Sequence, residues 1–99
     1  MRFISHLSIK VLPGQRDAAL SAYRSRRVLE ECSAAIPGFI EAHLLLSEDC
    51  SDTFCVVVEW SKLSDYQDWL AHPARAKQAE DLAEWVVQAP ETRLFHSLD

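Results

Sequence analysis

The sequence predicts an α+β fold with the element order β-α-β-β-α-β, and two observations predict it. Segments in which apolar and polar residues alternate, as in strands, are interspersed with segments whose apolar residues recur every three or four positions, as in helices. Pro-Gly pairs at positions 13–14 and 37–38 mark the ends of the first strand and of the first helix. This order is that of the ferredoxin-like arrangement, in which one antiparallel sheet carries both helices on one face.

The first strand is predicted over residues 3–12, where the side-chain period is two. One face carries Phe3, Leu7, Ile9 and Val11, and the other carries His6, Ser8 and Lys10. From Arg16 the period becomes that of a helix, and we predict one long helix that Pro37 ends. The apolar stripe of this helix consists of Ala18, Ala22, Ser25, Leu29, Cys32 and Ile36.

Strands over residues 39–47 and 53–60 are predicted to pair as a hairpin across the polar loop SEDCSD. Ser61 or Ser64 can cap the next helix, and Ser64 has capping-box spacing to Gln67. Pro73 can begin a new helical segment after His72. The apolar stripe of that segment is Ala76, Ala79, Ala83 and Val86, before Pro90 ends it and residues 93–98 form a last short strand.

Helices on one face of a sheet leave the other face to water or to a second sheet. Two strands have substantially apolar outward faces, and a chain of 99 residues buries only part of its surface. We therefore expect one domain over residues 1–99 that forms a symmetric homodimer, sheet against sheet. By alternation His6 and Glu59 point toward the partner, and we predict that they form a polar cluster in the interface, where the histidine could pair with the carboxylate.

Composition excludes several function classes. A net charge of −5 and a pI near 5.3 argue against nucleic-acid and anionic-membrane partners, which require a basic face. No run approaches membrane-spanning length, and the N-terminal segment is not a signal sequence. Three cysteines without CxxC spacing indicate neither a disulfide framework nor a zinc site, so we expect a reduced, cytoplasmic protein. Two glycines cannot form a phosphate-binding loop.

Four segments carry a family resemblance: PGFIEAHLLLS, FCVVVEW, SDYQDWLAHP and PETRLFHSL. Over nearly the whole chain they resemble the antibiotic biosynthesis monooxygenase (ABM) domain family. The resemblance implies a dimeric α+β barrel. Family members include cofactor-independent quinone-forming monooxygenases, haem-degrading enzymes and a quorum-signal-processing isomerase, so the fold alone does not select the chemistry.

The resemblance implies a cofactor-independent monooxygenase, without metal, that oxidises a small aromatic or polyketide-like substrate of phenol or anthrone type with dioxygen. The alternative is a non-catalytic or stress-associated dimeric barrel that binds a small ligand. Haem degradation comes third. The haem-degrading relatives carry an asparagine and an iron-ligating histidine where this chain has Leu7 and about Ala79, and neither side chain can replace them. A shifted alignment leaves His72 as a possible iron ligand.

Site residues follow from the same resemblance. In relatives the tryptophan at the end of the third strand lines the substrate cleft, so Trp60 and, on the next helix, Tyr66 are predicted as catalytic and substrate-binding. Leu7 and Trp69 are predicted as substrate-binding, with Trp69 as a cover or rim, and His72 as the candidate general base. The competing interpretation is packing, because Leu63, Tyr66 and Leu70 also form a core stripe.

Overall fold

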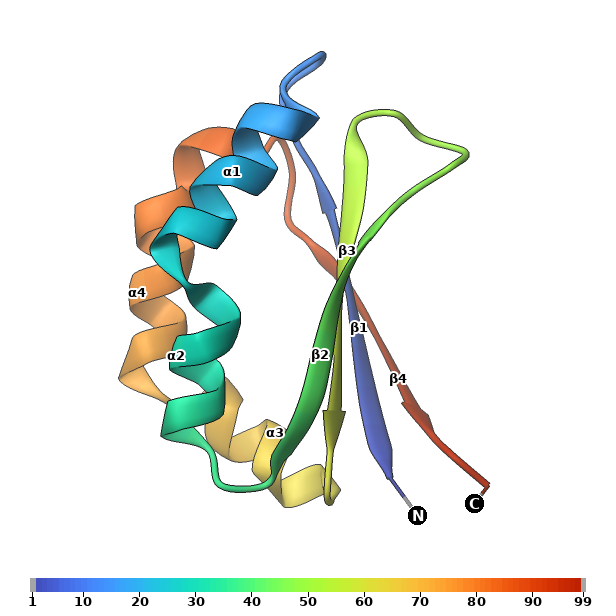
Figure 1. Cartoon of the computed structure of the whole chain (residues 1–99), viewed down its shortest axis with the longest axis vertical. Coiled ribbons are helices and arrows are strands. Elements are labelled where there is room, and N and C mark those ends of the chain that lie inside the picture. The colour runs from blue at the N-terminus through green and yellow to red at the C-terminus, as the bar shows by residue number, and fades with distance from the viewer. Residues whose placement is uncertain (1, 99) are drawn as a thin grey trace.

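The computed structural model describes residues 2–98, and within them the predicted α+β architecture is confirmed. The strands are β1 (Phe3–Lys10), β2 (Phe39–Leu46), β3 (Thr53–Trp60) and β4 (Glu91–His96). They form one antiparallel sheet in the order β2-β3-β1-β4, which is the ferredoxin-like order. The helices lie on one side of this sheet and leave the other side open (Figure 1).

The first helical region is two helices, not one. α1 (Arg16–Arg26) and α2 (Val28–Ala35) meet at Arg27, whose φ of 58° is left-handed. Because a left-handed residue changes the direction of the chain, one stripe cannot run through both helices. The predicted stripe is therefore wrong in α1, where Ala19, Leu20 and Tyr23 are buried while Ala18 and Ser25 are exposed, and right in Cys32 and Ile36.

The Asp65 side chain caps the N-terminus of the third helix, α3 (Leu63–Leu70). Asp65 accepts a hydrogen bond from the Lys62 backbone N–H at 3.1 Å and one from the Ser61 hydroxyl. The predicted box of Ser64 and Gln67 is therefore replaced by Asp65, with Ser61 as its partner. The same carboxyl group lies where a Cβ at position 38 would stand, so only glycine fits beside it in the Pro37-Gly38 turn.

α4 (Pro73–Leu82) begins as predicted, with Pro73 in its first turn. It ends before the predicted Val86, because a 3-10 turn, η1 (Ala83–Trp85), follows directly. Val86 then forms an isolated bridge with Val11, so residues 11–12 lie outside β1. β4 begins at Glu91, two positions before the predicted residue 93.

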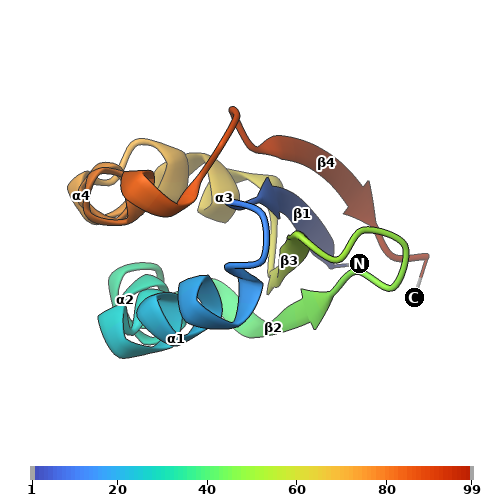
Figure 2. The same ribbon diagram turned by 90° about the horizontal axis from the view of Figure 1, so that it is seen from above.

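Two apolar clusters fill the space between sheet and helices. One gathers around Ile9, Val11 and Phe54 beneath α1, and the other around Trp60, Tyr66 and Trp69 beneath α3. Seen from above, α4 lies on one side of the helical layer and the α1–α2 pair on the other, with the sheet beside both (Figure 2). Among the helices of residues 2–98, none combines the length and apolar character that crossing a membrane requires.

Candidate functional site

A cavity of about 480 Å³ lies between the sheet and the helical layer. Its floor is formed by β1 and β3, its walls by α1, α2 and α4, and one end by the segment between η1 and β4. It is lined by Leu7, Ile9, Tyr23, Val28, Leu29, Cys32, Val56, Val58, Trp69, Arg75, Gln78, Ala79, Leu82, Ala83, Val86, Gln88, Ala89, Pro90 and Thr92. This volume falls in the range of small-molecule sites.

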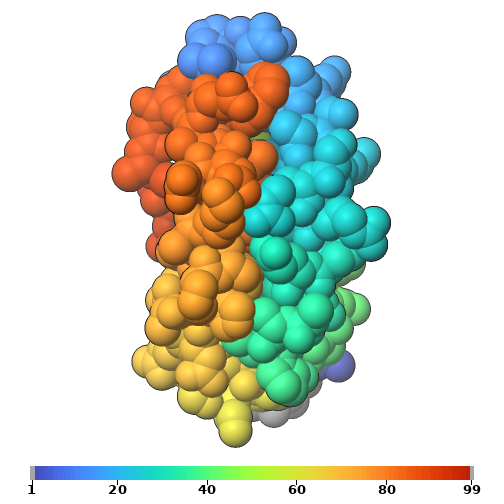
Figure 3. Space-filling model, turned by 90° about the vertical axis from the view of Figure 1, so that its left-hand side faces the viewer, coloured from blue at the N-terminus to red at the C-terminus, as the bar shows by residue number. Residues whose placement is uncertain are grey.

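One face of α4 forms a wall of this space. Only Leu82 of α4 is buried, and the lining residues of the helix recur at positions 75, 78, 79 and 82, which is the spacing of one helical face. Ala79 is too short to reach the aliphatic floor, whereas a leucine there would fill part of the gap. The helical face shows α4 and the α1–α2 pair meeting along one seam (Figure 3).

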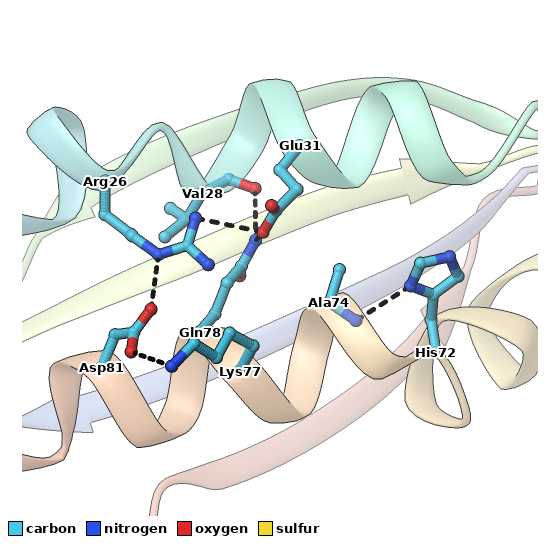
Figure 4. A network of polar contacts seen from close by, with 8 residues as sticks. All are labelled: Arg26, Val28, Glu31, His72, Ala74, Lys77, Gln78 and Asp81. Atoms are coloured by element: carbon cyan, nitrogen blue, oxygen red, sulfur yellow. Dashed lines mark hydrogen bonds and ion pairs between the residues drawn. The ribbon is translucent and has the colours of Figure 1, made fainter.

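A polar network joins the two walls across that seam (Figure 4). The Gln78 amide nitrogen donates to the Val28 carbonyl at 3.1 Å and to the Glu31 carboxylate at 2.8 Å. Arg26 pairs with Glu31 at 3.2 Å and with Asp81 at 3.0 Å. Both hydrogens of the Gln78 amide nitrogen are thus engaged within the protein, so Gln78 holds α2 to α4 and does not offer a donor to a ligand.

Two lining groups titrate outside the physiological range. Burial raises the pKa of the Cys32 thiol to about 12, so the thiol stays protonated and behaves as a small apolar side chain. Burial also raises the pKa of the Tyr23 phenol above its ordinary value. The Tyr23 ring packs edge-on against Phe54, with ring centroids 5.0 Å apart. Neither group can serve as a nucleophile or base near neutral pH.

The structure brings some of the predicted site residues together and separates others. Leu7 and Trp69, predicted as substrate-binding, both line the cavity. Trp60 and Tyr66 lie outside the lining, 0% and 9% exposed, in the cluster beneath α3. The Trp60 indole N–H donates to the Ser5 hydroxyl at 3.0 Å, so its polar group is satisfied inside the protein. Trp60 therefore supports the cavity wall at Val58 and Trp69, which belong to the same cluster.

His72 stands at the junction of α3 and α4. Its Nδ1 accepts a hydrogen bond from the Ala74 backbone N–H at 3.0 Å (Figure 4), and its ring stacks on Trp69 with centroids 5.8 Å apart. Because the Nδ1 lone pair is used, a neutral ring carries its proton on Nε2. His72 has no free lone pair in this geometry, so the predicted role as general base requires this cap to open.

On the open face of the sheet, Glu59 has different partners from the one predicted. Arg2 pairs with Glu59 at 3.2 Å, and Glu41 lies opposite it across β2 and β3. His6 stands opposite Val57, one pleat further along, and makes no ion pair with Glu59. A hydrogen bond with Glu41 raises the pKa of the Glu59 carboxyl, while the pKa of Glu41 is lowered by the bond to Glu59 and then by His43.

The donor set of the cavity does not fit haem. Haem iron is held by histidine, thiolate, methionine or tyrosinate. Among the described residues, the lining contains no histidine and no methionine, and its cysteine and tyrosine stay protonated. Leu7 and Ala79, the positions compared with the haem-degrading relatives, both line this cavity. Within residues 2–98, no cluster of three or more His, Cys, Asp or Glu side chains could hold a metal ion.

Several lining residues were missed by sequence reasoning. Arg75, Gln78 and Leu82 share a face of α4 with Ala79, and their spacing of three or four residues is the signal that could have identified them. Tyr23 was missed because the stripe assigned to α1 was rotated away from it. Gln88 lies in the connection between η1 and β4, and Thr92 lies near the start of β4, before the predicted beginning of that strand, so no pattern points to either.

A ferredoxin-like sheet with an apolar cavity beneath its helices defines a small α+β protein with an internal space of the size that small-molecule sites have. The sequence profile described as antibiotic biosynthesis monooxygenase matches residues 2–85. The chain therefore belongs to the antibiotic biosynthesis monooxygenase family, as its motifs predicted.

Solved structures share the fold. A candidate antibiotic biosynthesis monooxygenase from Caulobacter crescentus has a TM-score of 0.83 at 11% identity, covering 99% of this chain and 91% of that one. A second, from Bordetella bronchiseptica, has a TM-score of 0.82 at 16% identity, with 98% and 97% covered. A variant of SnoaB, a cofactor-independent oxygenase from Streptomyces nogalater, has a TM-score of 0.70 at 19% identity, with 99% and 94% covered. No curated protein matches the sequence.

Proposed function

We propose that the protein is a cofactor-independent monooxygenase that oxidises a small aromatic substrate of phenol or anthrone type, bound in the cavity beneath α4. The observation that supports this most is an apolar cavity of about 480 Å³ in a chain of the antibiotic biosynthesis monooxygenase family. A multi-ring aromatic molecule matches a site of this size with mainly aliphatic walls. The similarity to the fold of SnoaB, a cofactor-independent oxygenase, is consistent with this proposal.

The chemistry requires little of the protein. The substrate loses a proton, and its electron-rich anion gives electrons to dioxygen, so that a carbon–oxygen bond forms. One oxygen atom stays on the carbon as a carbonyl, and the other leaves as water. An anthrone supplies both hydrogens of that water from its oxidised CH2 carbon, whereas a phenol supplies one from its hydroxyl group and one from the oxidised carbon. The cavity contributes orientation of the rings, exclusion of water and access for dioxygen. Leu7 and Trp69 contact the rings in this proposal, and Trp60 and Tyr66 act by holding the wall behind Trp69.

A second candidate is a binding protein without catalytic activity, including a stress-associated one. The observation that favours it is the lack of a ready base in the described lining, because Cys32 is protonated and the lone pair of His72 Nδ1 caps α4. This candidate differs from the first by one result: aromatic ligands bind in the cavity, yet no oxygen is consumed.

Oxygen uptake tests the proposed function. Purified protein without added cofactor is mixed with anthrones and phenols, and uptake is compared with the protein-free rate to correct for autoxidation. Ala79→Phe should strongly reduce uptake because the ring takes up part of the space that the substrate needs. Ala76→Phe, at an alanine of the same helix that lies outside the lining, should leave uptake unchanged. Equal uptake in both variants would place the reaction outside this cavity. Binding without uptake would select the second candidate.

We further propose that the chain forms a homodimer through the open face of the sheet. No helix of the described chain covers this face (Figure 1). Its side chains mix apolar and charged groups, among them Ile4, Cys55, Val57 and Phe95 together with His6 and Glu59. Phe95 is 50% exposed, and a second sheet packed face to face would cover it.

A further inference from the structure

One charged group lines the cavity. Among the lining residues, all within the described chain, Arg75 is the single one with a full charge at neutral pH, and no aspartate, glutamate, lysine or histidine accompanies it. This is unexpected in a protein whose net charge is −5. A cation at the edge of an apolar space, without a carboxylate beside it, is a site for an anion.

Arg75 is free of the ion pairs that occupy other arginines. Arg2, Arg26 and Arg27 each pair with a carboxylate, whereas no ion pair or side-chain hydrogen bond in residues 2–98 involves the Arg75 guanidinium. Its side chain is half-buried, so it is partly withdrawn from water. Glu31, a carboxylate of α2 at the seam, is already bonded by Arg26 and Gln78.

We propose that Arg75 binds the ionised oxygen of the aromatic substrate and thereby selects substrates that carry an acidic hydroxyl group. This inference rests on the proposed function, because it assigns the substrate class of the same cavity. The rings lie over the apolar floor, and the oxygen anion accepts hydrogen bonds from the guanidinium. Arg75, in the first turn of α4, is a binding and specificity residue, and Trp69 of α3 contacts the rings.

In this proposal the Arg75 guanidinium makes a general base unnecessary, because it lowers the pKa of the bound hydroxyl group. A positive charge within hydrogen-bond distance lowers the pKa of an acid by about 1–3. In the described lining, the other titratable groups are Tyr23 on α1 and Cys32 on α2, and both stay neutral, so they do not oppose this effect. The O–H bond of the bound hydroxyl therefore breaks by releasing its proton to solvent, and the electron pair stays on the oxygen that faces Arg75.

Binding of alizarin tests this without turnover. Alizarin is a hydroxyanthraquinone whose phenol and phenolate forms have different visible spectra, and it is already oxidised. Its pKa and affinity are measured with wild-type protein, with Arg75→Gln, and with Arg24→Gln as the control, because Arg24 is exposed and outside the lining. We expect wild-type protein to lower the pKa of alizarin, and Arg75→Gln to abolish this shift and weaken phenolate binding by roughly ten- to a hundred-fold.

The results separate this proposal from the proposed function. Anthraquinone, which lacks the hydroxyl groups, should bind wild-type protein and Arg75→Gln equally. Equal alizarin affinity and pKa in both proteins would overturn the role of Arg75, because its guanidinium would then lie in solvent with only its stem against the cavity. A lost shift in Arg75→Gln together with an absence of oxygen uptake would support the anion site and refute the oxygenase.

Discussion

Trp60, predicted as a catalytic and substrate-binding residue, lies behind the wall of the cavity and not in its lining. The end of a strand marks it as prominent, but alternation cannot tell whether an inward side chain reaches a ligand or only the core. In the structure Trp60 is fully buried, and its indole N–H donates a hydrogen bond to the Ser5 hydroxyl. Nothing in the sequence around Ser5 predicts this contact. The predicted lining residues Leu7 and Trp69 do reach the cavity.

We expect Trp60→Phe to act on stability. The change removes the hydrogen bond to Ser5 and leaves part of the indole volume empty, which should lower the free energy of unfolding by about 2–3 kcal/mol. Ser5→Ala should cost about 1–3 kcal/mol because it leaves the buried indole N–H unpaired. Urea denaturation measures both, and the double variant should lose less than the sum. A stable Trp60→Phe that has lost oxygen uptake would instead support the catalytic role predicted from sequence.

At the scale of the elements, the sequence predicts the four strands and the two helical regions in their observed order, because periodicity and Pro-Gly turns are local signals. It does not predict the break between α1 and α2. Arg27 is not a residue that favours a left-handed backbone, and nothing around it resembles a helix end. Tertiary packing sets this break, since it turns Tyr23 and Val28 inward together.

Arg27→Gly tests the cost of that break. A side chain in the left-handed region is strained by roughly 1–2 kcal/mol, and glycine relieves this strain. Glycine also gains freedom in the unfolded chain, so we expect the free energy of unfolding to rise by only about 0.5–1 kcal/mol. Arg27→Ala is the control: it removes the same exposed ion pair with Glu30, at 3.6 Å, but keeps a Cβ, so it should not stabilise. A gain in Arg27→Ala equal to that in Arg27→Gly would show that the backbone at this position is unstrained.

At the scale of the whole molecule, the placement of all helices on one face of the sheet can be predicted from the sequence, because it follows from the β-α-β-β-α-β order. The cavity is harder to predict. It depends on how far α4 stands from the sheet, and this distance is set by side chains from several elements that are distant in sequence. Ala79 and Ala83 of the predicted apolar stripe border this open space, whereas Ala76 lies outside the lining.

The carboxyl pair on the open face makes the proposed dimer sensitive to pH. A hydrogen bond with Glu41 raises the pKa of Glu59 above its ordinary value of 4.5, and Arg2 opposes this only in part. Because the pKa of Glu59 is higher in the folded protein than in the unfolded chain, its protonation contributes to the free energy of unfolding. This contribution is complete at pH values below 4.5 and is lost as the pH rises through the pKa of the folded protein. Glu41, with its lowered pKa, stays charged throughout that rise. A second sheet over the pair would exclude water and favour the singly protonated state.

Sedimentation velocity at acidic and neutral pH measures the consequence. We expect the wild-type dimer to weaken as pH rises through the native pKa of Glu59, because two adjacent carboxylates must then be buried. Glu41→Gln keeps a hydrogen-bonding group beside Glu59 but removes one charge, so its dimer should be tighter at neutral pH and less dependent on pH in this range. His43→Gln is the control for the lost contact between His43 and Glu41, at 3.5 Å. A dimer whose affinity is equally pH-dependent in Glu41→Gln would place the interface away from this pair, and a monomer at all concentrations would refute the assembly itself.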